Sequence, residues 1–245
     1  MTELAVDVVG EGETVLLVHG SGRRDGAWPE QLELGERFRL VLPYRRGYAP
    51  SPEADPDFDV DARDIVSLLE EPAHVVGHSY GGVASLVAAG LRPEAFRSVT
   101  VIEPPAFGIV RGRPEVEELI GRMEAAFQVE DPEEFDRAFY AALGVQRPYD
   151  RLTEETLPVA EARRRERMPW EAEIPFEWLG EIPVLVVSGN WNPSFEAVCD
   201  VLEERLGAER AVFTGHGHVP QDAPGFNERL VSFWGRAARP PADRP

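Results

Sequence analysis

A serine in the middle of a glycine-flanked motif is the residue in this sequence best placed to do chemistry. The motif Gly-His-Ser-Tyr-Gly occupies positions 77–81, with Ser79 at its centre. A β-branched run precedes it and the small apolar residues of 83–89 follow it, which predicts a strand, a sharp turn and a helix. The hydroxyl would then stand near the free N–H groups of a helix N-terminus, which stabilise an oxyanion. The alternative is that Ser79 only caps the helix, but the predicted strand and helix favour a nucleophile.

A serine hydroxyl is a weak nucleophile until a base takes its proton, and histidine suits that task at neutral pH. The chain has five histidines. His78 lies beside the serine and is expected to point away from it, whereas His74 begins the strand at its opposite end. His19 closes an earlier strand and is expected to hold a neighbouring loop. His216 and His218 remain, in a glycine-rich loop after the last predicted strand.

The histidine in turn needs an acid that orients it and stabilises its charged form. The loop after the strand at 183–187 carries Asn192, an amide that can orient an imidazole without supplying charge. The other suitable position is Glu103, directly after the strand at 98–102. Glu103 could instead be only a carboxylate at the hinge of the following segment. Because no aspartate occupies the loop of Asn192, we predict that Glu103 is the acid.

Alternating apolar runs and helical segments place these residues in an α/β fold. Buried runs such as 15–18 and 40–42, each followed by a helical pattern, predict a mostly parallel central sheet with helices on both faces. Loops at the carboxyl ends of such strands form the site. The alternation stops at 107–181, which we predict to be a helical lid inserted between two parts of one core, 1–106 and 182–245.

The predicted lid is rich in aromatic and charged residues. Its aromatic side chains, together with two tryptophans of the core, are expected to shape an apolar substrate pocket, although each could equally be core packing; the five are Trp28, Trp170, Phe176, Trp178 and Trp191. The arginine run 163–165 is flanked by glutamates. A solvated, ion-paired helix face is therefore favoured over an anion site.

The composition excludes several classes of function. A formal net charge of -19 and a pI near 4.7 argue against nucleic acid or an anionic membrane surface as a partner. None of the basic residues is lysine, which excludes lysine chemistry, and the single cysteine, Cys199, allows no internal disulfide. No signal peptide or apolar membrane-spanning run is visible, so we expect a cytoplasmic protein. His216 and His218 lack a convincing set of partner ligands, so no metal site is predicted.

Three motifs together resemble those of the α/β-hydrolase superfamily. They are the oxyanion loop at 19–22, the turn at 77–81, known there as the nucleophile elbow, and the histidine loop at 215–218. The resemblance implies Ser79 as nucleophile, His218 as base, and the backbone N–H groups of Ser21 and Tyr80 as the oxyanion hole. Asn192 departs from the commoner pattern. The chain resembles instead members whose acid follows the sixth strand of the family's sheet, which makes Glu103 the acid.

These observations predict a serine hydrolase that cleaves a small or medium acyl compound, most simply a carboxylic ester, through an acyl-enzyme. No cofactor is implied, and the expected partner is a small-molecule substrate; a homodimer is left open. The rival hypothesis is a protein of the same fold that binds or rearranges a small molecule without acyl-enzyme chemistry. Its motivation is the uncharged Asn192 at the usual position of the acid.

Overall fold

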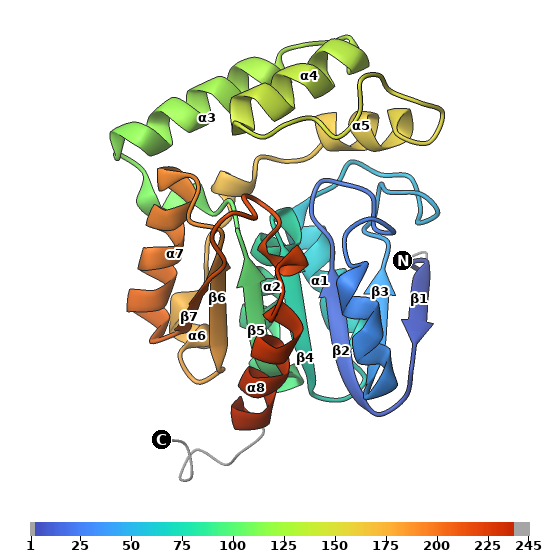
Figure 1. Ribbon diagram of the computed structural model, residues 1–245, viewed down its shortest axis with the longest axis vertical. Coiled ribbons are helices and arrows are strands. Elements are labelled where there is room, and N and C mark those ends of the chain that lie inside the picture. Colours follow the sequence, from blue (N-terminus) through green and yellow to red (C-terminus); the bar gives the residue numbers. More distant parts are fainter. Residues whose placement is uncertain (1–2, 238–245) are drawn as a thin grey trace.

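The computed structural model describes residues 3–237 and is built on one seven-stranded sheet with the order β1-β3-β2-β4-β5-β6-β7 (Figure 1). Only β1 runs antiparallel to its neighbour, and all other pairings are parallel. The strands are β1 (Val6–Val9), β2 (Glu13–Val18), β3 (Phe38–Pro43), β4 (Ala73–His78), β5 (Phe96–Ile102), β6 (Val184–Ser188) and β7 (Glu209–Val212). This confirms the predicted mostly parallel α/β sheet.

Alternating side chains of the buried strands divide the core into two clusters, one on each face of the sheet. In β2, Leu16 and Val18 pack on one face, whereas Val15 and Leu17 pack on the other. The first face is covered by α1 (Phe58–Leu68), α2 (Tyr80–Leu91) and α7 (Pro193–Leu206). The second is covered by the 3-10 helix η1 (Glu30–Glu36) and α8 (Phe226–Ala237). A strand segment covered on both faces must be apolar, as residues 15–18 of β2 are.

A group of three helices lies across the carboxyl ends of the strands (Figure 1). They are α3 (Pro114–Phe127), α4 (Pro132–Leu143) and α5 (Leu157–Arg164), with the short 3-10 helices η3 (Phe107–Val110) and η4 (Pro169–Glu171) at their base. We call residues 107–171 the lid insertion. The rest of the predicted 107–181 segment takes another course, because α6 (Phe176–Leu179) packs against α2 and α7 of the core.

The structure describes neither the first two nor the last eight residues of the chain. Residues 1, 2 and 238–245, which belong to the two predicted parts of the core, lie outside the described residues. Within residues 3–237, no helix combines the length and the apolar character that crossing a bilayer requires.

Candidate active site

The turn between β4 and α2 holds Ser79 in a strained conformation. Its φ of 53° and ψ of -123° are unusual for a residue with a side chain, and such strained residues are concentrated at functional sites. The glycines on either side are required by close approach. A Cβ atom on Gly77 would lie 2.4 Å from the Gly81 carbonyl oxygen, and one on Gly81 would lie 2.5 Å from the His19 carbonyl oxygen. The glycine spacing seen in the sequence thus permits the turn that exposes Ser79.

An imidazole lies within hydrogen-bonding distance of the serine. The Nε2 atom of His218 is 3.0 Å from Ser79 Oγ, close enough for direct proton transfer. His218 lies in the loop between β7 and the 3-10 helix η5 (Pro220–Asp222). Ser79, His216 and His218 line one cavity, but the hydrogen bond with Ser79 Oγ is made by the His218 ring. Of the two histidines that the sequence left open, the structure therefore brings His218 to Ser79.

His78 holds the backbone of the histidine loop, a role that the sequence did not reveal. Burial lowers its pKa from 6.5 to about 3, so the ring is neutral near pH 7. Its Nε2–H donates a hydrogen bond of 2.8 Å to the His218 carbonyl oxygen. The ring centroids of His78 and His218 are 5.0 Å apart. His78 thus stabilises the loop that carries His218.

Glu103 reaches the other side of the His218 ring. Its Oε2 lies 3.5 Å from His218 Nδ1, an ion-pairing distance once the imidazole is protonated. The side chain is fully buried and its backbone has a φ of 50°. Its two oxygens accept hydrogen bonds from Gly189 N–H (2.6 Å) and Trp191 Nε1–H (2.9 Å). These donors support a carboxylate in a buried position.

Asn192 caps a helix instead of contacting His218. It is the N-cap of α7, where its side-chain oxygen accepts a hydrogen bond of 2.9 Å from Ser194 N–H. Asparagine is among the favoured residues at this position because its oxygen pairs with an N–H group that the helix leaves free. Of the two candidates for the acid, only Glu103 therefore lies against His218.

The predicted oxyanion loop lies directly beside the nucleophile. A Cβ atom added to Gly20 would be 2.8 Å from Ser79 Cβ, and Ser21 lines the cavity in front of the serine. Tyr80 begins α2, so its N–H has no partner within the helix. His19 accepts a hydrogen bond from Arg45 N–H on Nε2 (3.0 Å), which leaves Nδ1–H to donate to the Gly20 carbonyl oxygen (2.8 Å). His19 therefore holds this loop, as expected.

Three histidines with lowered pKa values, His78 among them, make the stability of the fold sensitive to acid. Burial lowers the pKa of His19 to about 3 and that of His74 to about 4, from 6.5 for both. As the pH falls below 6.5, the pKa in the unfolded chain, the unfolded chain binds protons that the folded chain does not. The free energy of unfolding therefore decreases. Between about pH 7 and about pH 5, each histidine is expected to cost about 2 kcal/mol. Urea unfolding at both pH values measures the loss.

The variant His74→Gln provides the control for that prediction. Its free energy of unfolding should fall by about 2 kcal/mol less than that of the wild type over the same pH interval, because one depressed imidazole is absent. An equal fall in both proteins would show that His74 does not titrate as its burial implies.

A family model described as the alpha/beta hydrolase family matches residues 15–227. The chain belongs to this family. The match includes Ser79, Glu103 and His218, and it confirms the resemblance inferred from the three motifs.

Several relatives of this alpha/beta hydrolase are esterases and hydrolases. A pimeloyl-[acyl-carrier protein] methyl ester esterase from Methylococcus capsulatus is 31% identical over 151 residues, which cover 60% of this chain and 59% of the relative. A putative carbamate hydrolase from Azorhizobium caulinodans is 32% identical over 110 residues, 41% of this chain and 40% of the relative. The matches thus span less than two thirds of these relatives.

Solved structures of the same fold cover almost the whole chain. An esterase from a Rhodococcus species matches with a TM-score of 0.72 at 21% identity, over 96% of this chain and 95% of its own. An enzyme described as degrading N-acyl homoserine lactones matches with a TM-score of 0.69 at 22% identity, over 94% of this chain and 96% of its own. At such identities the likeness shows the alpha/beta hydrolase fold.

The site of this alpha/beta hydrolase opens into a cavity of about 980 Å³ beneath the lid insertion. Ser79 and His218 lie in its wall, and most of the remaining surface is apolar. Among the residues that form this apolar part are Phe107, Met123, Phe127, Leu143, Trp170 and Trp191. Two of the five aromatic residues predicted to contact substrate therefore face the cavity, Trp170 and Trp191.

The other three aromatic residues lie elsewhere, and we withdraw them as substrate contacts. Trp28 is buried in the core cluster on the η1 and α8 face of the sheet, with its ring 6.4 Å from that of His78. Phe176 lies in α6, with the Arg205 guanidinium 3.5 Å from its ring centroid. Trp178 has 59% of its surface exposed. Aromatic composition alone could not separate the cavity wall from core and surface.

The arginine run of the insertion also differs from its prediction. Arg163 is ion-paired, as expected, but it is buried rather than solvated, and it lines the cavity. Its Nη1 donates to Asp136 Oδ1 at 2.6 Å. Arg165 pairs at 3.1 Å with the exposed Asp55. Arg163 is therefore buried and Arg165 lies at the surface, as expected for two residues that are two positions apart at the end of a helix.

Metal ligands do not gather in the part of the chain that the structure describes. Among residues 3–237, no group of three or more histidine, cysteine, aspartate or glutamate side chains could hold a metal ion. Cys199 is buried in α7, and burial raises the pKa of its thiol.

Proposed function

We propose that this chain is a serine hydrolase that cleaves a small or medium acyl compound, most simply a carboxylic ester. The observation that supports it best is the 3.0 Å contact between Ser79 Oγ and His218 Nε2, at a turn whose strain exposes the serine to the cavity. The pimeloyl-[acyl-carrier protein] methyl ester esterase that is 31% identical to this chain supports the same class of reaction. The expected partner is a small molecule, because the cavity lies under the lid insertion.

In the proposed mechanism, Ser79 Oγ attacks the carbonyl carbon while its proton passes to His218 Nε2. Glu103, 3.5 Å from Nδ1, stabilises the resulting imidazolium. The carbonyl oxygen becomes an oxyanion, which the N–H groups of Ser21 and Tyr80 stabilise by about 3 kcal/mol each. His218 then gives its proton to the leaving alcohol. Water, activated by the same imidazole, hydrolyses the acyl-enzyme and restores Ser79.

The cavity favours an acyl group that is apolar. Side chains from α3 and α4, including Met123, Phe127 and Leu143, form much of its wall above the serine. Burying an alkyl chain there contributes about 0.8 kcal/mol per methylene. We therefore propose that esters with medium alkyl or aryl acyl groups are cleaved with higher kcat/KM than acetyl esters.

A fluorophosphonate probe tests the proposed chemistry directly. We expect one equivalent of probe to label the protein, with the label on Ser79, because phosphonylation requires the same activated serine and the same oxyanion donors. Intact-mass spectrometry and peptide mapping measure it. A folded protein that resists the probe would favour the rival hypothesis of a protein that binds or rearranges a small molecule. The observation behind that rival, Asn192 at the usual acid position, now has a structural explanation as a helix cap.

A further inference from the structure

The peptide that joins Gly20 to Ser21 is fixed through its carbonyl oxygen. This oxygen accepts hydrogen bonds from His19 Nδ1–H at 2.8 Å and from Arg45 Nη1–H at 2.9 Å. In a trans peptide the C=O and N–H groups point in opposite directions. Donors on the Gly20 oxygen therefore decide where the Ser21 N–H is directed. Because that N–H is the proposed oxyanion donor, the position of Arg45 bears on the chemistry.

Arg45 is buried between two carboxylates that come from different parts of the chain. Its Nε donates to Asp61 of α1 at 2.8 Å, and its Nη1 lies 3.1 Å from Glu166 Oε1. All three side chains are buried. Glu166 also accepts a hydrogen bond of 2.7 Å from the Tyr48 hydroxyl. Glu166 belongs to the lid insertion, so the insertion supplies one of the two charges that locate the guanidinium.

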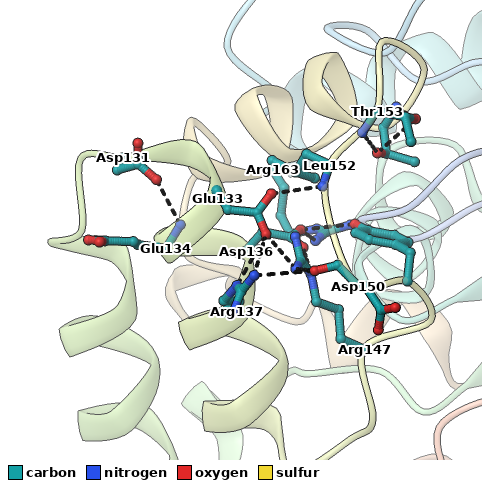
Figure 2. Close-up of polar contacts among 12 residues, drawn as sticks. Asp131, Glu133, Glu134, Asp136, Arg137, Arg147, Asp150, Leu152, Thr153 and Arg163 are labelled. Atoms are coloured by element: carbon teal, nitrogen blue, oxygen red, sulfur yellow. Dashed lines mark hydrogen bonds and ion pairs between the residues drawn. The ribbon is translucent and has the colours of Figure 1, made fainter.

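The lid insertion also bonds to Ser21 itself, at two different atoms. The Ser21 hydroxyl donates to Glu166 Oε2 at 2.5 Å, and the Ser21 carbonyl oxygen accepts from Arg163 Nε at 2.6 Å. Arg163 is anchored on Asp136 of α4 at 2.6 Å, and Arg147 reaches the same carboxylate at 2.6 Å. Figure 2 shows Arg163 and Arg147 converging near Asp136.

We propose that Glu166 and Arg163 are positioning residues that hold the Ser21 N–H in place for the oxyanion. The inference rests on the proposed hydrolase function and assigns this task to the lid insertion. Buried ion pairs add little net stability compared with apolar packing, but they define one arrangement. Here the arrangement that they define is that of the peptide beside Ser79. The substrate cavity and the oxyanion donor are therefore set by the same inserted segment.

The variant Glu166→Gln tests this role with little change in shape. It removes the negative charge shared by Arg45 and the Ser21 hydroxyl. On a p-nitrophenyl ester we expect kcat to fall by about 10- to 100-fold while KM changes by less than about 2-fold, because a misplaced donor is felt mainly in the transition state. Affinity for a trifluoromethyl ketone, whose adduct with Ser79 carries an oxyanion, should fall by a similar factor.

A matched variant separates positioning from a general effect of the insertion. Glu171→Gln removes an exposed carboxylate of the same segment, paired with Arg167 at 3.0 Å. Its kcat and its ketone affinity should stay within about 2-fold of the wild type. Should Glu166→Gln fold poorly, Ser21→Ala removes only the hydroxyl contact and keeps the N–H. We expect that variant to lose about 3- to 10-fold in kcat at unchanged KM.

Failure of the positioning role and failure of the proposed hydrolase function give different results. If Glu166→Gln and Ser21→Ala both keep kcat and ketone affinity within about 2-fold of the wild type, while Ser79→Ala is inactive, the positioning role is rejected and the proposed hydrolase remains. If Ser79→Ala keeps its activity, the proposed function itself fails.

Discussion

Replacing Ser79 with alanine is expected to lower kcat for p-nitrophenyl esters by about 10⁴-fold or more, with the fold intact. The reason is that the variant lacks the hydroxyl that lies 3.0 Å from His218 Nε2 and that the mechanism uses as nucleophile. Residual hydrolysis would come from the oxyanion donors and from binding alone. Steady-state kinetics on esters of graded chain length, together with circular dichroism of the variant, measure the effect.

The control for this variant is a second serine-to-alanine change. Ser67 lies on the exposed side of α1, where its hydroxyl donates to the Asp64 carbonyl oxygen at 2.7 Å. Ser67→Ala should leave kcat within about 2-fold of the wild type, since surface changes far from the site have small effects. Undiminished turnover by Ser79→Ala would rule out the acyl-enzyme mechanism.

The second large effect is expected at Glu103. Replacing it with glutamine should lower kcat by about 10²- to 10⁴-fold, because the amide cannot stabilise the imidazolium that forms on His218. Glutamine also brings an N–H₂ group to a position where Gly189 N–H and Trp191 Nε1–H both require acceptors. One of those donors then loses its partner, so the variant should also be less stable. Steady-state kinetics and urea unfolding measure the two losses.

Asn192→Ala is the matched comparison, because Asn192 was the other candidate for the orienting residue. We expect it to lower the free energy of unfolding by about 1 kcal/mol through loss of the α7 cap, with kcat within about 2-fold of the wild type. A larger kcat loss at Asn192 than at Glu103 would reverse the assignment of the acid. The two variants therefore separate loss of a cap from loss of a charge.

The nucleophile turn and the sheet around it were predictable from the sequence because their determinants are local. Gly77 permits a close approach to Gly81, which lies only a few positions further along the chain. The continuous apolar run of β2 follows from burial on both faces, which the structure shows as two clusters divided by alternate side chains. Each pattern needs only a few consecutive residues, so the chain order of the motifs was enough to recognise the fold.

The contacts between distant segments were decided by the tertiary structure. Whether Glu103 or Asn192 meets His218 depends on the course of the loops after β5 and β6. The local sequence around each residue permits either outcome. Likewise, the pattern around Arg163 predicts an ion-paired helix, but only the seating of the lid insertion buries it against Ser21. The physical reason is range: propensity and periodicity act within a few residues, whereas side chains more than a hundred positions apart meet only when packing fixes the paths of both loops.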